Sequence, residues 1–247
     1  MKEGLIYVRV DFGVLRNIIR DRNNKQKAAT DSAECLREFL NLDTNLIEEN
    51  RSMKQDEAAN FIMSMQNWLL RRGFSSTKET VAVGDIFYAD LGINYKPEFS
   101  YHHPVIILEK IAGMYMVVPV STTPDNISQA YHPVDNTNGS KMMRKVYGND
   151  TGSQSDGFEK TGAVLLTDVK VISAGRLISK KGQLKDISNE GSLFREIKES
   201  VFKFCFPKVN IRLYKSEKEL KELKEKYTQL ETAYNELKNS IEVKDSE

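Results

Sequence analysis

The stretch PVIILEKIAGMYMVVPVST, residues 104–122, decides the fold. It holds two apolar runs, 104–108 and 114–122, on either side of a short segment that ends in Ala112 and Gly113. Branched and aromatic side chains of this kind favour strands, and a strand tolerates a proline at its first position. Two such runs around a glycine-containing turn predict a β-hairpin.

Further strand-like segments lie on both sides of this hairpin. DIFYADL (85–91) precedes it, and GAVLL (162–166) and VKVISAGRLI (169–178) follow it. Several short strands without helices between them favour a small antiparallel barrel over a doubly wound sheet. Residues 135–160 are rich in Gly, Asn, Ser and Asp and predict a long loop or mobile hairpin, which in compact domains is usually functional or disordered.

Helical patterns flank the strands. Residues 31–73 carry two apolar stripes and end in Arg71, Arg72 and Gly73, which predicts an αα-hairpin with a normal helix stop. Residues 190–206 form an amphipathic segment that ends at Pro207. Beyond it, apolar residues recur at alternating spacings of three and four: Leu220, Leu223, Tyr227, Leu230, Tyr234, Leu237 and Ile241.

This spacing predicts a coiled coil of about three heptads. A single helix lying on the rest of the protein is the alternative. The expected class is therefore α+β, with an N-terminal helical region (1–80), a barrel domain (81–207) and a C-terminal coiled coil (208–247).

Composition and charge restrict the function classes. The net charge is +1 and hydrophobic residues make up 40% of the chain. No apolar run is long enough to cross a bilayer, so we expect a cytoplasmic protein. Cys35 and Cys205 have no metal-ligand spacing and are expected to be small buried side chains. Residues 1–30 are basic, which fits either an arm that contacts nucleic acid or a frayed terminus.

Four motifs in the central region occur in an order that resembles the MazF/PemK family of type II toxins. They are GDIFYADLG (84–92), HPVIILEK (103–110), VVPVST (117–122) and GAVLLTDVKVISAGRL (162–177). The resemblance covers roughly residues 82–206. It implies an SH3-like (MazF/CcdB-like) barrel, a homodimer, an antitoxin partner, and cleavage of single-stranded RNA without metal or any other cofactor.

The resemblance also implies site residues. His103 stands where the family's R-P-V motif has arginine, and His102 lies beside it. Arginine is a permanent forked cation, whereas histidine is mostly neutral at cell pH, so His103 suits acid–base work better than charge clamping. Arg176 and Lys170 match basic positions of the family's last strands. Ser121 or Thr122 matches its Ser/Thr after the VP strand.

The candidate catalytic residues are thus His103, Thr122, Ser121 and His102. Metal-free RNA cleavage needs a base for the 2′-OH, an acid for the leaving oxygen, and a cation for the phosphorane. Acidic, aromatic and basic side chains on the loops and strands are the candidate RNA contacts: Glu98, Tyr101, His132, Arg144, Lys145, Lys170 and Arg176.

Three functions remain open from the sequence. The leading one is a metal-independent endoribonuclease toxin. The second is a catalytically inactive RNA- or protein-binding module that is dimerised by the coiled coil. The third is a gyrase poison of the CcdB type, which uses a C-terminal helix. The helix at 190–206 runs into Pro207 and a further helical segment instead of a free terminus, which argues against the third.

Overall fold

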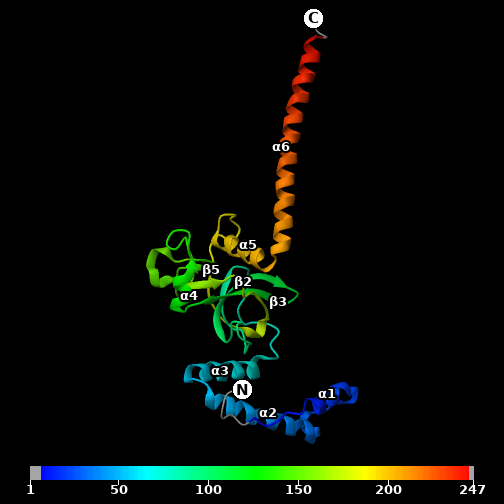
Figure 1. Cartoon of the computed structure of the whole chain (residues 1–247), viewed down its shortest axis with the longest axis vertical. Coiled ribbons are helices and arrows are strands. Elements are labelled where there is room, and N and C mark those ends of the chain that lie inside the picture. The colour runs from blue at the N-terminus through cyan, green and yellow to red at the C-terminus, as the bar shows by residue number, and fades with distance from the viewer. Residues whose placement is uncertain (1–6, 245–247) are drawn as a thin grey trace. The chain divides into compact units, whose positions relative to one another are not determined.

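The computed structural model describes residues 7–244, except the side chains of 153–154 and 236–244. The chain divides into two compact units, Met1–Leu69 and Leu70–Glu247. Figure 1 colours them from blue at the N-terminus to red at the C-terminus. Each unit is described by itself.

The N-terminal unit is helical. It contains α1 (Phe12–Arg20), α2 (Ala33–Ser52) and most of α3 (Gln55–Arg71), with two 3-10 turns between α1 and α2. Asp11 caps α1 by accepting hydrogen bonds from the N–H groups of Gly13 and Val14, and Ser32 caps α2. Helix α1 corrects the expectation of a frayed basic arm, because its capped turn orders part of that segment. Residues 1–6 of the expected arm lie outside the described residues.

This unit has no apolar core within residues 7–69. The buried side chains there are Glu38 and Ser64. Many large apolar side chains on its helices are exposed: Phe12, Ile19, Phe39, Leu40, Ile47, Ile62, Trp68 and Leu69. The expected helices are confirmed in α2 and α3, but the apolar stripes do not bury one another as a packed hairpin would.

Polar contacts hold the start of the described chain to α2. The N–H of Val8 donates to the side-chain oxygen of Asn45 at 2.7 Å, and the amide of Asn45 donates back to the Val8 carbonyl at 2.8 Å. The N–H of Asp11 donates to Glu38 at 2.8 Å. Glu38 is thus covered by the segment 7–11, which explains a buried carboxylate in a unit without a core.

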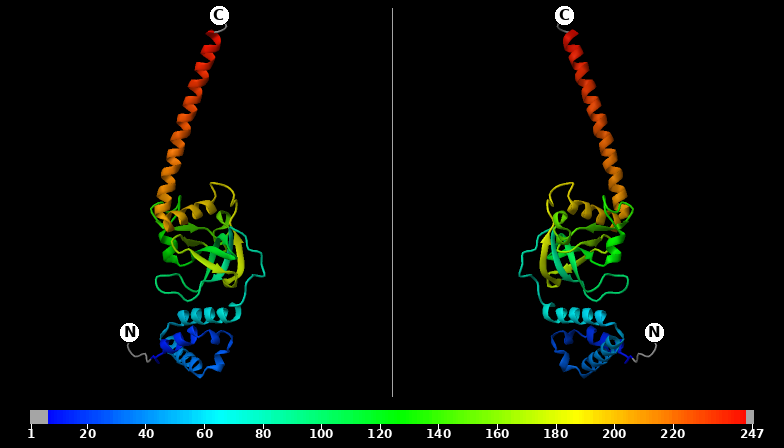
Figure 2. Two further views of the ribbon diagram at one scale, coloured as in Figure 1. Left: turned by 90° about the vertical axis from the view of Figure 1, so that its right-hand side faces the viewer. Right: turned by 90° about the vertical axis from the view of Figure 1, so that its left-hand side faces the viewer.

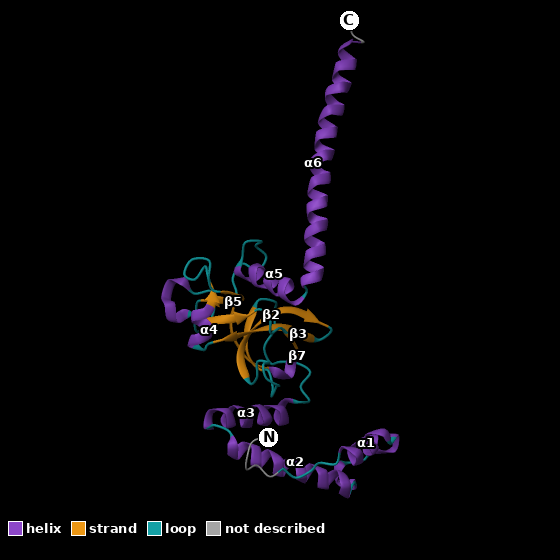
Figure 3. Cartoon of the chain, viewed as in Figure 1, coloured by secondary structure: helices purple, strands orange, loops and turns teal. Residues whose placement is uncertain are grey.

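Residues 81–205, here called the sheet domain, contain eight strands. They are β1 (Asp85–Asp90), β2 (His102–Ile111), β3 (Met114–Ser121), β4 (Ala130–Tyr131), β5 (Ser140–Val146), β6 (Gly162–Leu165), β7 (Lys170–Ser173) and β8 (Leu177–Gln183). The strand order is β4-β5-β6-β3-β2-β1-β8, and β7 pairs with β3. Figure 3 shows these strands in orange and the helices in purple.

The central hairpin confirms the reading of residues 104–122. Val105 lies opposite Pro119 and Ile111 opposite Met114, with the turn at Ala112 and Gly113. Both turn residues have positive φ, 47° and 81°, a backbone conformation that glycine adopts without strain. The sheet path is open between β4 and β8, so a closed barrel stays a prediction.

The two faces of the central strands bury separate apolar clusters, because successive side chains of a strand point to opposite faces. One cluster includes Ile86, Ile106 and Val118 and is covered by α5 (Leu193–Cys205) through Phe194, Ile197 and Val201. The other includes Phe87, Ala89, Val105 and Ile107, with Ile172 and Leu177. Alternation along one stretch of sequence therefore fills both layers.

Several sequence expectations need correction. Residues 169–178 form two strands, not one, because the 3-10 turn Ala174–Arg176 redirects the chain from β3 to β1. Residues 135–160 contain β5, which pairs with β6, and α4 (Pro124–Gln129) precedes β4. Cys205 is exposed and Cys35 is partly exposed, so neither is a buried filler.

Helix α6 (Pro207–Lys244) begins two residues after α5 ends. Figure 2 shows it as one uninterrupted helix, coloured orange to red. From Ile211 to Tyr234 every described residue is exposed. Among the described residues, no helix is long and apolar enough to span a membrane.

Candidate functional site

The loop between β1 and β2, residues 91–101, is closed at its base. The N–H of Leu91 donates to the Tyr101 carbonyl, and the N–H of Tyr101 donates to the Gly92 carbonyl, both at 2.7 Å. Inside the loop, the Asn94 amide donates to the carbonyls of Leu91 and Phe99 at 3.2 and 2.8 Å. These bonds fix where Glu98 and Phe99 lie. Tyr101, a predicted RNA contact, instead has φ 67° and serves the base of the loop.

Three of the sequence-predicted residues meet around Phe99. Its ring centroid lies 3.9 Å from that of His103, and its N–H donates to a carboxylate oxygen of Asp168 at 3.0 Å. The Lys170 ammonium lies 3.5 Å from Glu98 and 3.7 Å from Asp168. We call Glu98, Phe99, His103, Asp168 and Lys170 the loop site.

The loop site borders a cleft of about 480 Å³, lined by residues 97–99 on one side and by Met142, Met143 and Leu165 on the other. Asp168 was not among the predicted site residues. The sequence held a signal for it, because it stands in the TDV segment directly before the strand that carries Lys170.

The environment of His103 makes it a neutral side chain. Burial is the main cause that lowers its pKa to about 4, and the neighbouring His102 lowers it further, although a hydrogen bond with the backbone of Ser100 acts the other way. Near neutral pH the ring therefore carries no charge. It can donate or accept a hydrogen bond, but it is no substitute for an arginine as a charge clamp.

His102 lies on the opposite face of β2 from His103. It is buried, its Nε2 is 3.8 Å from a carboxylate oxygen of Asp90, and its ring is stacked 5.9 Å from that of Tyr88. The two candidate catalytic histidines therefore do not face one cleft, because neighbouring side chains on a strand point to opposite faces.

Ser121 and Thr122 end β3 differently. Ser121 is buried, its Oγ lies 2.6 Å from the Thr123 hydroxyl, and it accepts a hydrogen bond from the Asn126 amide at 2.8 Å. It therefore shapes the entry to α4. Thr122 is exposed at the next position. The register of Val105 with Pro119 places Ser121 and His103 at the same end of neighbouring strands.

The two arginines among the candidate RNA contacts bond to other groups of the protein. Arg144 is buried, and its guanidinium makes two bonds to Glu196 of α5, at 2.6 and 3.1 Å, so its predicted RNA contact is wrong. Arg176 donates to the Asp90 carbonyl at 3.1 Å. It packs so closely on Gly92 that a Cβ there would lie 2.6 Å from its Nη1. Both arginines are thus tied to the protein itself.

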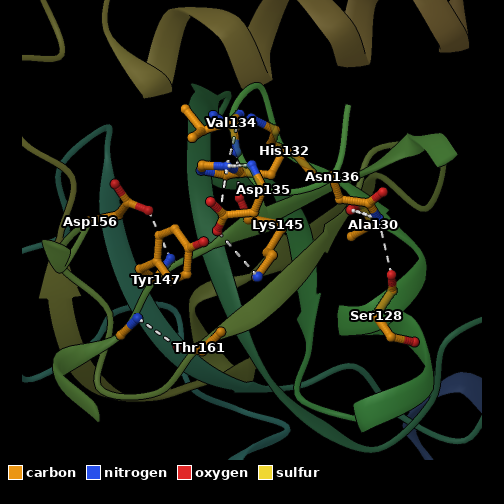
Figure 4. Close-up of polar contacts among 12 residues, drawn as sticks. Ser128, Ala130, His132, Val134, Asp135, Asn136, Lys145, Tyr147, Asp156 and Thr161 are labelled. Carbon is orange, nitrogen blue, oxygen red and sulfur yellow. Dashed lines mark hydrogen bonds and ion pairs between the residues drawn. The ribbon is translucent and has the colours of Figure 1, made fainter. Parts of the chain in front are cut away.

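His132 belongs to a second cluster, drawn in Figure 4. Its Nδ1 accepts hydrogen bonds from the N–H groups of Val134 and Asp135 at 3.2 and 3.1 Å. Its ring meets that of Tyr147 edge-on at 5.1 Å, and Lys145 pairs with Asp135 at 3.6 Å. Burial and the nearby Arg144 lower the pKa of His132. Because the backbone occupies Nδ1, the free proton of the neutral ring sits on Nε2.

The second cluster continues into the loop after β5. Asp156 accepts a hydrogen bond from the N–H of Tyr147 at 2.7 Å, and burial raises the pKa of its carboxyl. Within the described residues, no group of three or more His, Cys, Asp or Glu side chains is placed to hold a metal ion. His132 and Lys145 therefore lie in a group that holds loops together, apart from the contacts of the loop site.

No family model matches the sequence, and no curated protein matches it. The solved structures that match part of this chain include two nucleases. One is MazF (Form-I) from Deinococcus radiodurans, at 9% identity and TM-score 0.36, covering 54% of this chain and 99% of that one. The other is an endoribonuclease from a mycobacterial species, at 12% identity and TM-score 0.32, covering 52% of this chain and 93% of that one. At these scores the likeness assigns no function.

Proposed function

We propose that the sheet domain is a metal-independent endoribonuclease that cleaves single-stranded RNA, with an SH3-like barrel that acts as a homodimer. The observation that carries the proposal is the meeting of Glu98, His103 and Lys170 around Phe99 beside an open cleft. The ordered motifs of the MazF/PemK resemblance support it. On this reading the protein is the cytoplasmic toxin of a toxin–antitoxin pair, and its second partner is a cognate antitoxin.

The loop site offers the groups that this reaction needs. The half-exposed Glu98 carboxylate takes the proton of the ribose 2′-OH as its oxygen bonds to phosphorus. The Lys170 ammonium stabilises the phosphorane charge and gives a proton to the departing 5′ oxygen. Proton exchange across the 3.5 Å Glu98–Lys170 pair then restores both groups. The products are a 2′,3′-cyclic phosphate and a free 5′-OH.

Phe99 and His103 bind the substrate in this scheme. Unpaired bases stack on aromatic side chains, and the ring of Phe99 lines the cleft with the ring of His103 against it. The exposed hydroxyl of Thr122 lies at the same end of the sheet as a further phosphate contact.

The test is cleavage of single-stranded RNA in the presence of EDTA. We expect activity in the unaltered chain and a loss on the order of 10²–10⁴-fold in Glu98→Gln and Lys170→Met, the range of general acid–base contributions. Lys110→Met, which removes an exposed lysine near the far end of β2, is the matched control and should keep full activity. An equal loss in the control would remove Lys170 from the mechanism.

A second function has its own observation. The ring of His103 is neutral where the related toxins have a cation, which favours a module that binds RNA without cleaving it. RNA that stays intact while fluorescence anisotropy shows binding would establish this second function. If His103→Arg then cleaves that RNA, loss of the arginine is the reason.

A further inference from the structure

Helix α6 presents an apolar stripe that its own chain does not cover. Leu213, Leu220, Leu223, Tyr227, Leu230 and Tyr234 are each exposed by 48–71%. The helix has 38 residues, which corresponds to a length of about 57 Å. Helical propensity alone seldom keeps a helix of this kind folded in water, so burial of the stripe is what would stabilise it.

The spacing of the stripe selects the kind of surface that covers it. A straight helix drifts by about 20° per heptad against a 3.5-residue repeat. The strict alternation of three and four from Leu220 to Tyr234 therefore fits a partner helix that supercoils with α6. A flat or compact protein surface would lose contact with it after a few turns.

The charges beside the stripe select the partner. With Leu213, Leu220, Tyr227 and Tyr234 at heptad position a, the charged g positions are Arg212, Glu219 and Lys226, before the first three of them. The e positions are Glu217, Lys224 and Glu231. In a parallel dimer in register, each g residue faces the e residue five positions later in the other helix. The pairs are then Arg212–Glu217, Glu219–Lys224 and Lys226–Glu231, all of opposite charge.

We propose that α6 pairs with α6 of a second copy of this chain in a parallel, in-register coiled coil. Two-fold symmetry forms each of the three pairs twice. The ion pair between Lys218 and Glu222, 4.0 Å apart within one helix, lies on the outer face and does not compete. Ser216 at a d position and tyrosines at a positions weaken the core of the coil. Its assembly is therefore reversible and depends on concentration.

The experiment uses the full chain with Leu230→Cys as a reporter at a d position, where parallel in-register helices bring identical residues together. Two charge variants carry the reporter. We call Glu219–Lys224 and Lys226–Glu231 the inner pairs. E219K/E231K leaves two positive residues in each inner pair, and K224E/K226E leaves two negative residues in each. We expect oxidation to give a rapid disulfide dimer in the reporter chain, and a rate lower by about tenfold or more in each variant alone.

In a mixed dimer with one copy of each variant, each of the two inner pairs forms twice, and all four contacts join opposite charges. We expect a rapid mixed disulfide, resolved on a gel by a size tag on one variant. The outer-face swap K218E/E222K, which also reverses two charges, should crosslink like the reporter chain. The chain with its own Cys35 and Cys205 alone gives the background, and circular dichroism checks that each variant keeps its helix.

Three results would overturn the proposal: no disulfide above background in the reporter chain, undiminished crosslinking in each variant alone, or no mixed product. An antiparallel pair or a different partner gives the first of these. RNA cleavage does not enter the readout, so this result and that of the ribonuclease test stand apart.

Discussion

The N-terminal unit and the sheet domain use apolar residues in opposite ways. Ile106 and Val117 of the sheet domain are fully buried, whereas Phe39 and Trp68 of the N-terminal unit are 62% and 53% exposed. Both regions show regular apolar spacing in sequence. The difference teaches that the spacing of apolar residues predicts a helix or a strand, whereas burial of those residues requires a second layer to pack against. The stability of the chain should therefore reside in the sheet domain, and the helices before it should open at low cost.

The sharpest test exchanges one phenylalanine in each region. Phe87→Ala in β1 should lower the free energy of unfolding by about 3–5 kcal/mol, because it leaves a cavity in a buried cluster. Phe39→Ala in α2 should change it by less than about 0.5 kcal/mol, as exposed substitutions do. Urea unfolding followed by circular dichroism measures both. Equal losses would mean that the N-terminal helices share the core of the sheet domain.

A half-buried ion pair should matter more than an exposed one. Arg144→Met removes both bonds to Glu196 and leaves that carboxylate without its partner, so we expect a loss of about 2 kcal/mol. Lys218→Met removes an exposed pair with Glu222 and should cost at most about 0.5 kcal/mol. Urea midpoints compare them. A stable Arg144→Met that also binds RNA less tightly would return Arg144 to the list of RNA contacts.

Acid should weaken the sheet domain through His103. The folded chain holds the pKa of this ring at about 4, whereas the unfolded chain has the ordinary value near 6.5. Between these values the unfolded state binds more protons, so stability falls as the pH falls. From about pH 7 to about pH 5 the unaltered chain should lose on the order of 1–2 kcal/mol more than His103→Phe. Urea unfolding at both pH values measures the loss in each protein. An equal loss in the unaltered chain and in His103→Phe would disprove this prediction.

The smallest effect is local and belongs to the N-terminal unit. Hydrogen bonds from the N–H of Asp11 and from Arg37 lower the pKa of Glu38. A carboxyl with a lowered pKa stabilises its contacts above its ordinary pKa and loses them as the pH falls through the folded value. The Asp11 amide should thus be protected from hydrogen exchange near neutral pH and exposed in acid. Glu38→Gln should show the weaker protection at neutral pH already, with the strands of the sheet domain unchanged.

Sequence predicts the parts of this fold that depend on neighbours in the chain. The hairpin at 104–122 and the end of α5 before Pro207 follow from local spacing and turn residues. The partner of Arg144 lies 52 residues away, so a basic loop residue could not be distinguished from a buried one. The split of residues 169–178 into β7 and β8 depends on which strands accept each half.

The candidate site shows the same division. Resemblance placed His103 at the arginine position and Lys170 on the last strands. It could not supply the low pKa of His103, which comes from burial, nor the anchor at Asp168, whose contact with Phe99 spans 69 residues. Alternation along β2 could have predicted from the sequence that His102 and His103 do not share one site, because adjacent strand residues face opposite sides.

The backbone pair between Leu91 and Tyr101 gives the β1–β2 loop a fixed frame. The side chains of this loop that line the cleft lie between these two residues, within 93–100. Because the cost of loop closure rises only slowly with length, insertions or exchanges there need not disturb β1 or β2. Residues 93–100 can therefore change in evolution, or be replaced by a grafted loop between Leu91 and Tyr101, while the two strands stay as they are.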